Sequence, residues 1–74
     1  MYILSQDRKV LIQFGGADGF TMLNVTRNFG GKEKYAITAS GQIMGLYLEE
    51  KTALDELVKI LTAIEENKQT YMMN

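Results

Sequence analysis

The sequence contains no cysteine and no histidine, and it also lacks proline and tryptophan. Without cysteine there is no disulfide bond and no thiolate nucleophile. Cysteine and histidine supply most of the ligands that bind zinc in proteins, so a structural zinc site is all but excluded. We therefore expect a protein without a metal or any other cofactor.

An excess of either charge is missing too. Eight basic and nine acidic residues leave a formal net charge of −1, whereas nucleic-acid-binding domains are usually basic. No apolar run approaches the 18 residues that suggest a membrane span, and no basic leader precedes an apolar segment at the N-terminus. We expect a cytoplasmic protein that contacts neither membrane nor nucleic acid.

The length of 74 residues predicts a single domain over residues 1–74. A domain of this size buries only about 60% of the surface that its unfolded chain exposes. Such domains usually depend on disulfides, a metal or oligomerisation. Because the first two are excluded, we expect a homo-oligomer or a complex with another protein.

Apolar and polar residues alternate with the period of β-strands over the first two thirds of the chain. Short polar or glycine-rich connections separate the apolar runs, so neighbouring strands should pair antiparallel. The pattern predicts five strands, at Tyr2–Ser5, Val10–Phe14, Phe20–Thr26, Lys34–Ala39 and Ile43–Leu48.

From Glu49 onward the apolar period changes to about 3.6 residues, which predicts an amphipathic helix ending near Asn67. Its expected apolar face consists of Ala53, Leu54, Leu57, Ile60, Leu61 and Ile64. Residues 70–73 form a tail that could return to the sheet as a further strand. The fold class is therefore α+β, an antiparallel sheet of about five strands with one C-terminal helix packed on one face.

The predicted strands carry apolar residues on both faces. In the first strand Tyr2 and Leu4 oppose Ile3, and in the second Leu11 opposes Ile12. One helix covers only about half the width of a five-stranded sheet. Two explanations remain open: the second face binds a partner, or the sheet curls enough to bury both faces.

Catalytic motifs are missing from the sequence. There is no histidine or cysteine, and no G-x-S-x-G motif surrounds Ser5 or Ser40. The carboxylates fall mostly on loops and on the polar face of the helix, and nothing places two of them together in a pocket. We expect the protein not to be an enzyme.

A small basic group, Arg27, Lys32 and Lys34, is interleaved with the aromatic residues Phe29 and Tyr35. The glycine pair before Lys32 could form a backbone nest for an anion, or it could be an ordinary hairpin connection. Aromatic and basic side chains on a sheet can also bind nucleic acid, but no RNP-type motif accompanies them here.

Three segments resemble a group of small uncharacterised proteins of Gram-positive bacteria and their phages. They are Met1–Asp7 with Lys9, then Gly45–Glu50, and finally Tyr71–Met73, where this chain has methionine in place of a frequent proline. The resemblance covers about half of the chain, leaves residues 15–33 unmatched and implies no catalytic residue. It implies a phage or prophage origin.

Two functions follow as expectations. The first is a phage accessory protein that acts by binding, as an inhibitor of a host protein of antiviral defence. The alternative is a homo-oligomeric sponge that sequesters a small anionic signalling molecule on Arg27, Lys32 and Lys34. The expected binding residues are these three with Phe29, Tyr35 and Leu11.

Overall fold

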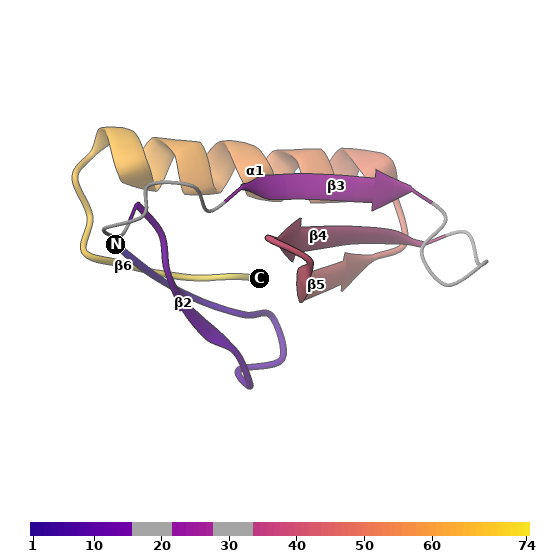
Figure 1. Cartoon of the computed structure of the whole chain (residues 1–74). Coiled ribbons are helices and arrows are strands. Elements are labelled where there is room, and N and C mark those ends of the chain that lie inside the picture. The colour runs from indigo at the N-terminus through magenta and orange to yellow at the C-terminus, as the bar shows by residue number, and fades with distance from the viewer. Residues whose placement is uncertain (16–21, 28–33) are drawn as a thin grey trace.

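The computed structural model describes residues 1–15, 22–27 and 34–74 (Figure 1). Within these ranges, six strands and one helix follow one another as β1 (Tyr2–Leu4), β2 (Leu11–Gln13), β3 (Leu23–Arg27), β4 (Tyr35–Ala39), β5 (Gln42–Tyr47), α1 (Glu50–Glu65) and β6 (Thr70–Met72). The α+β class predicted from the sequence is confirmed.

The strands form two three-stranded sheets, where a single sheet was expected. One sheet has the order β3-β4-β5 and is antiparallel throughout. The other has the order β2-β1-β6, and here β6 pairs with β1 in parallel. The parallel pair arises because α1 carries the chain back along the molecule, so the tail enters the sheet in the direction of β1. Short connections alone would have produced only antiparallel neighbours.

The turn between β1 and β2 is closed by side chains. The Ser5 hydroxyl donates to Oδ1 of Asp7 at 2.6 Å and accepts from the Val10 amide at 3.0 Å. The Lys9 amide also donates to the Asp7 carboxylate. Serine and aspartate favour turns because their side chains bond nearby backbone groups in this way. The hydrogen bonds from Ser5 and Lys9 lower the pKa of the Asp7 carboxyl.

The same turn joins the two sheets. The Gln6 amide donates to the Met44 carbonyl, and Oε1 of Gln6 accepts from the Leu46 amide, both at 2.8 Å. These bonds occupy part of the outer edge of β5. Arg8 has a positive φ of 67° and donates to the Met73 carbonyl at 2.7 Å, beyond the end of β6.

The helix α1 begins after Glu49 and has an acidic residue, Glu50, in its first turn, where negative charge suits the helix dipole. It ends at Glu65, and Asn67, two residues later, has a φ of 57°. The Lys68 amide donates back to the Ala63 carbonyl at 3.0 Å, the bond expected when a left-handed residue terminates a helix. Among the described residues, no helix combines the length and the apolar run that crossing a bilayer requires.

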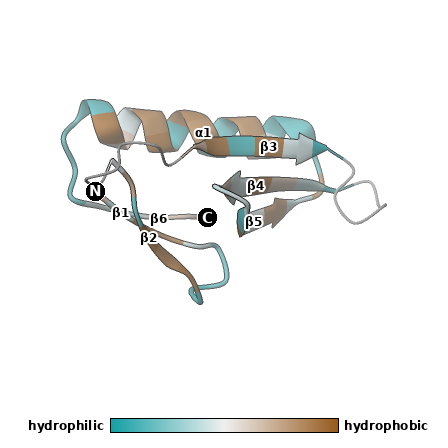
Figure 2. Ribbon diagram, viewed as in Figure 1, coloured by the Kyte–Doolittle hydropathy of each residue, from teal (hydrophilic) through white to brown (hydrophobic). Residues whose placement is uncertain are grey.

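The face of α1 that meets the sheets differs from the expected one. The buried residues are Ala53, Glu56, Ile60 and Ala63. Leu54 and Leu61, both expected inside, are 47% and 53% exposed. The apolar side chains of α1 extend around more of the helix than the sheets cover, so some of them remain exposed to solvent. Figure 2 shows apolar colour recurring along the length of the helix.

The main core lies where the helix and both sheets meet. Its buried residues are Ile3, Ile37, Ala39, Met44, Tyr47, Ala53, Ile60 and Met73. Met44 sits at a β-bulge between β4 and β5, which accommodates its side chain inside the molecule. The strands therefore bury much of their apolar surface by dividing into two sheets.

Gly45 provides a test of packing in this core. A Cβ at this position would lie 2.8 Å from Oη and 2.9 Å from Cε2 of Tyr47. The ring has little room to move, because Tyr47 is buried and its hydroxyl donates to the Asn74 carbonyl at 2.9 Å. We expect Gly45→Ala to lower the free energy of unfolding by about 1–3 kcal/mol in urea denaturation.

The Tyr47→Phe background is the control for this prediction. Phenylalanine lacks the hydroxyl that stands closest to the added methyl group, so Gly45→Ala should cost less there. An equal cost in both backgrounds would show that the hydroxyl is not the obstacle, and no cost in the wild-type chain would show that the Tyr47 side chain is not an obstacle at all.

Candidate functional site

The outer face of the β2-β1-β6 sheet is apolar. In the register of the sheet, Leu4 lies opposite Leu11 of β2 and Met72 of β6. Tyr2, two residues before Leu4, points to the same face because side chains alternate along a strand. The opposite face of this sheet carries Ile3 and turns toward the core.

These side chains line a groove of about 280 Å³, together with Thr70 and Tyr71. Tyr2 is 46% exposed, Leu11 62% and Met72 63%. Single exposed apolar residues are common, but a contiguous group usually marks an interaction surface. Among the described residues, those that line the groove include no ionisable group other than the tyrosines.

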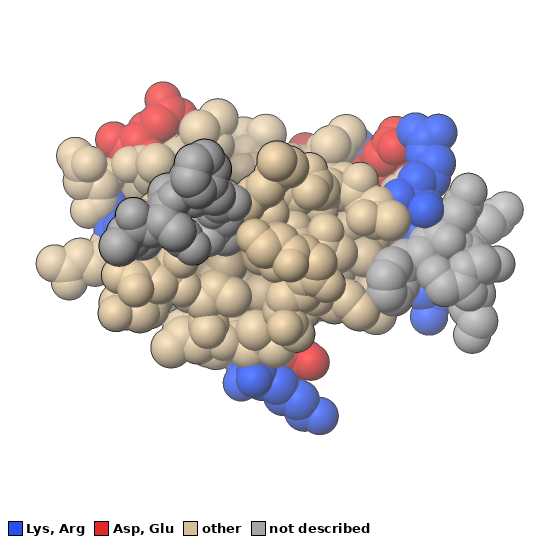
Figure 3. All heavy atoms as spheres, in the orientation of Figure 1, with Lys and Arg blue, Asp and Glu red and all other residues tan. Residues whose placement is uncertain are grey.

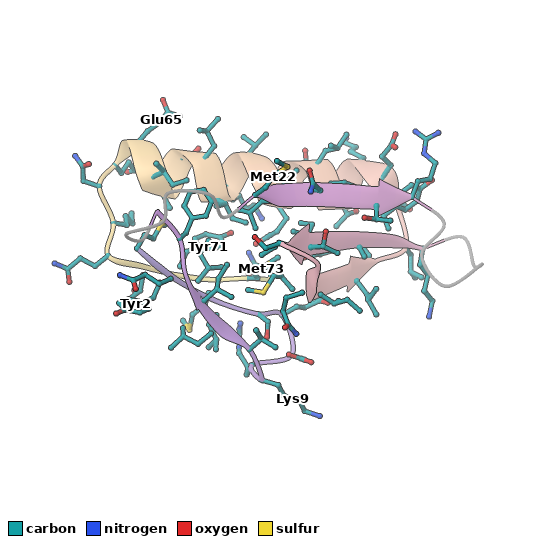
Figure 4. All side chains as sticks on the ribbon, viewed as in Figure 1. Tyr2, Lys9, Met22, Glu65, Tyr71 and Met73 are labelled. Carbon is teal, nitrogen blue, oxygen red and sulfur yellow. The ribbon has the colours of Figure 1, made fainter. Side chains whose placement is uncertain are left out.

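The figures show how the groove is placed. In Figure 4 Tyr2 lies on the side of the sheet away from α1, whereas Tyr71 and Met73 lie on the side toward the core. Figure 3 shows charged side chains at the margins of the face in view, among them those below the β1–β2 hairpin. Lys9 is at the tip of that hairpin (Figure 4). The groove is thus open to solvent on one side and backed by packed residues on the other.

Behind the groove, a buried carboxylate anchors β6. Glu56 is only 3% exposed. Its Oε2 accepts from the Tyr71 hydroxyl at 2.7 Å and from the Asn74 amide at 3.2 Å, and its Oε1 accepts from Nδ2 of Asn74 at 3.2 Å. A charged group is tolerated inside a protein when hydrogen bonds replace its water. Glu56 therefore connects α1 to the strand that forms one wall of the groove.

Two tyrosines belong to the same network. The Tyr47 hydroxyl donates to the Asn74 carbonyl. Burial, with the nearby charge of Glu56, raises the pKa of Tyr47 to about 12. Burial and the hydrogen bond to Glu56 also raise the pKa of Tyr71 above its ordinary value. Both phenols are thus held in the neutral form that donates a hydrogen bond.

The predicted basic site is only partly described, because Lys32 and Phe29 lie outside the described residues. Arg27 at the end of β3 donates to Glu50 of the helix at 2.7 Å, so its charge is already paired. Tyr35 faces the core, against which it packs. Lys34 is half-buried beside it. Leu11 is in the other sheet, apart from this group, and lines the groove instead.

Tyr2, Leu4 and Met72 were missed as candidate binding residues, although the sequence contained the signal. The alternation that set Leu11 apart also places Tyr2 and Leu4 on one face of the first strand. What was lacking is the pairing of β6 with β1, which adds Met72 to that face. The burial of Glu56 had no signal, because glutamate in a helix is normally exposed.

Nothing in the described part of the chain gathers three carboxylates into a potential metal site. No protein-family model matches the chain, and no curated protein or solved structure is significantly similar to it.

We expect Glu56→Leu to lower the free energy of unfolding by about 2–4 kcal/mol, because the Tyr71 hydroxyl and the Asn74 amides lose their acceptor. Glu56→Gln retains an acceptor oxygen and should cost less. The measurement is urea denaturation, with Glu66→Leu as the matched control, because Glu66 is exposed and directly follows the same helix. A Glu56→Leu cost no larger than that of Glu66→Leu would contradict the role of the network.

The raised phenol pKa values predict a loss of stability in alkali. In the unfolded chain Tyr47 ionises near pH 10.0, but in the folded chain only near pH 12. Its contribution is complete below pH 10.0 and is lost as the pH rises toward about 12. We expect the urea midpoint to fall over this range, and to fall less in Tyr47→Phe. Parallel curves for the two proteins would be inconsistent with a buried neutral phenol at this position.

Proposed function

We propose that this chain is a non-enzymatic binding protein of phage or prophage origin, which inhibits a host protein of antiviral defence. The groove formed by Tyr2, Leu4, Leu11 and Met72 is the observation that carries the proposal. It presents aromatic and methionine side chains, which are enriched in the centres of protein interfaces.

The chemistry of the groove favours a protein as the partner. The described residues that line the groove carry no charge. An apolar side chain of the partner can therefore be buried there without leaving a charge unpaired. Methionine adapts its shape to the group that it contacts. The anchored wall of β6 keeps the surface formed before binding, which lowers the entropic cost of association.

The alternative, a sponge for an anionic molecule, has weaker support. Such a site needs free cations, and Arg27 already donates to Glu50. The phage origin and the role against host defence rest on the resemblance of the β1–β2 hairpin, the end of β5 and the C-terminal tail to small proteins of Gram-positive bacteria and their phages. A small binding protein without reactive side chains suits such a role.

We expect Leu11→Glu to abolish the inhibition, because it places a charge in the apolar groove. The chain is expressed in Gram-positive strains that each carry one antiviral defence system, and the efficiency of plating of a restricted phage is measured. The wild-type chain should raise plating in at least one strain. Leu11→Glu should remove about 10-fold or more of this gain, as expected for a residue at the centre of an interface.

Leu48→Glu is the matched control, because Leu48 is 77% exposed and lies outside the groove. It makes the same chemical change and should retain the wild-type effect. No gain in plating with any defence system would refute the anti-defence role. Equal gains with Leu11→Glu and the wild-type chain would refute the groove as the binding surface.

A further inference from the structure

The outer side of α1 carries a second feature, separate from the groove. Five residues follow one another at intervals of three, four, three and four positions, namely Lys51, Leu54, Val58, Leu61 and Glu65. This alternation averages 3.5 residues, the spacing that keeps side chains on one line along a helix and forms the contact line of paired helices. We call this line the α1 seam.

The α1 seam faces away from both sheets. Its three apolar members, Leu54, Val58 and Leu61, are 47%, 58% and 53% exposed. Lys51 and Glu65 are exposed as well, and Figure 4 shows Glu65 pointing away from the rest of the molecule. The described residues offer neither of the two an ion-pair partner.

The two ends of the α1 seam have opposite charges and lie at equal distances from its centre. Lys51 is seven residues before Val58 and Glu65 is seven residues after it, so each lies about 10 Å along the helix axis from Val58. Leu54 and Leu61 lie on either side of Val58 at nearly equal distances. The α1 seam is therefore complementary to a second copy of itself that runs in the opposite direction.

Only one orientation of two such helices satisfies the charges. In an antiparallel pair with a two-fold axis near Val58, each Lys51 meets the Glu65 of the other copy. In a parallel pair, Lys51 would meet Lys51 and Glu65 would meet Glu65, and like charges across an interface are unfavourable. A two-fold axis is also the commonest symmetry of protein dimers.

The residues that flank the α1 seam fit the same arrangement. On one side lie Leu57, which is half-buried, and Ile64, which is 36% exposed. Both widen the apolar strip. On the other side lie Asp55 and Thr62. In the antiparallel pair Asp55 faces the neutral Thr62 of the other copy rather than a second carboxylate.

From this geometry we infer that the chain forms a two-fold homodimer through antiparallel contact of its α1 helices along the seam. The occupant of this helix face is a second copy of the chain. A contact between two helices of 16 residues buries less than the roughly 1,200 Å² of a stable interface, so the dimer is weak and depends on concentration.

The dimer leaves the groove free on each copy, because the groove lies on the outer face of a different element, the β2-β1-β6 sheet. The inference is therefore independent of the proposed function. If the dimer and the proposed function of the groove both hold, each dimer presents two grooves. A target that is itself a dimer would then be bound with higher avidity.

Charge reversal tests the pairing directly. Sedimentation equilibrium at low salt gives the dimer dissociation constant of the full chain. Lys51→Glu alone and Glu65→Lys alone each create two like-charged pairs per dimer. We expect either to raise the dissociation constant by about 10-fold, because two attractive pairs at the surface are replaced by two repulsive ones. The double variant Lys51→Glu/Glu65→Lys restores opposite charges and should dimerise like the wild-type chain.

Two variants serve as controls. Lys59→Glu and Glu66→Lys make the same changes in net charge at positions that lie one residue beyond Val58 and Glu65, off the seam, and should leave the dissociation constant unchanged. Val58→Glu places two carboxylates together at the axis and should abolish the dimer. Because Val58 is exposed, each variant should keep the circular dichroism spectrum of the wild-type chain.

The outcomes divide cleanly. Loss of the dimer on single reversal and its recovery in the double variant support the antiparallel seam. A wild-type chain that stays monomeric at millimolar concentration overturns the inference. A dimer that persists in Val58→Glu, or that the double variant does not recover, overturns it as well, because the contact then lies elsewhere or has another orientation.

Discussion

The turn between β1 and β2 is the constraint on which the rest of the structure depends. Ser5 and Asp7 close it, while Gln6 reaches the edge of β5 and Arg8 reaches the carbonyl of Met73. Two parts of the chain that are distant in sequence, β5 and the C-terminal tail, are thus tied to one four-residue segment. The Gln6 bonds link the two sheets, and the Arg8 bond holds the chain just beyond β6, which forms one wall of the groove.

Much of the fold could be predicted, because the patterns that define it involve residues close together in the sequence. The strands and α1 follow from periodicity, and the end of the helix follows from Asn67, which adopts a left-handed conformation easily. The outward placement of Leu11 could be predicted because it opposes Ile12 in the alternation of the strand. These features depend only on residues close together in the sequence.

The features that escaped prediction depend on distant residues. The parallel pairing of β6 with β1 brings Met72 beside Leu4, and no local pattern encodes it. Glu56 is buried because Tyr71 and Asn74 arrive with three donors. The choice of the helix face follows from these contacts too. Nothing in the sequence indicated that Arg27 has an ion-pair partner, but Glu50 lies within reach once the helix packs on the sheet.

The bond between Arg8 and Met73 joins residues 65 positions apart, and this has a consequence for synthesis of the chain. While the ribosome is still making α1, β1 and β2 can form a hairpin, but the β6 wall of the groove does not yet exist. Contacts of such long sequence separation form late in folding. A truncated or half-folded copy therefore lacks a complete groove, and only molecules that have finished folding present this surface.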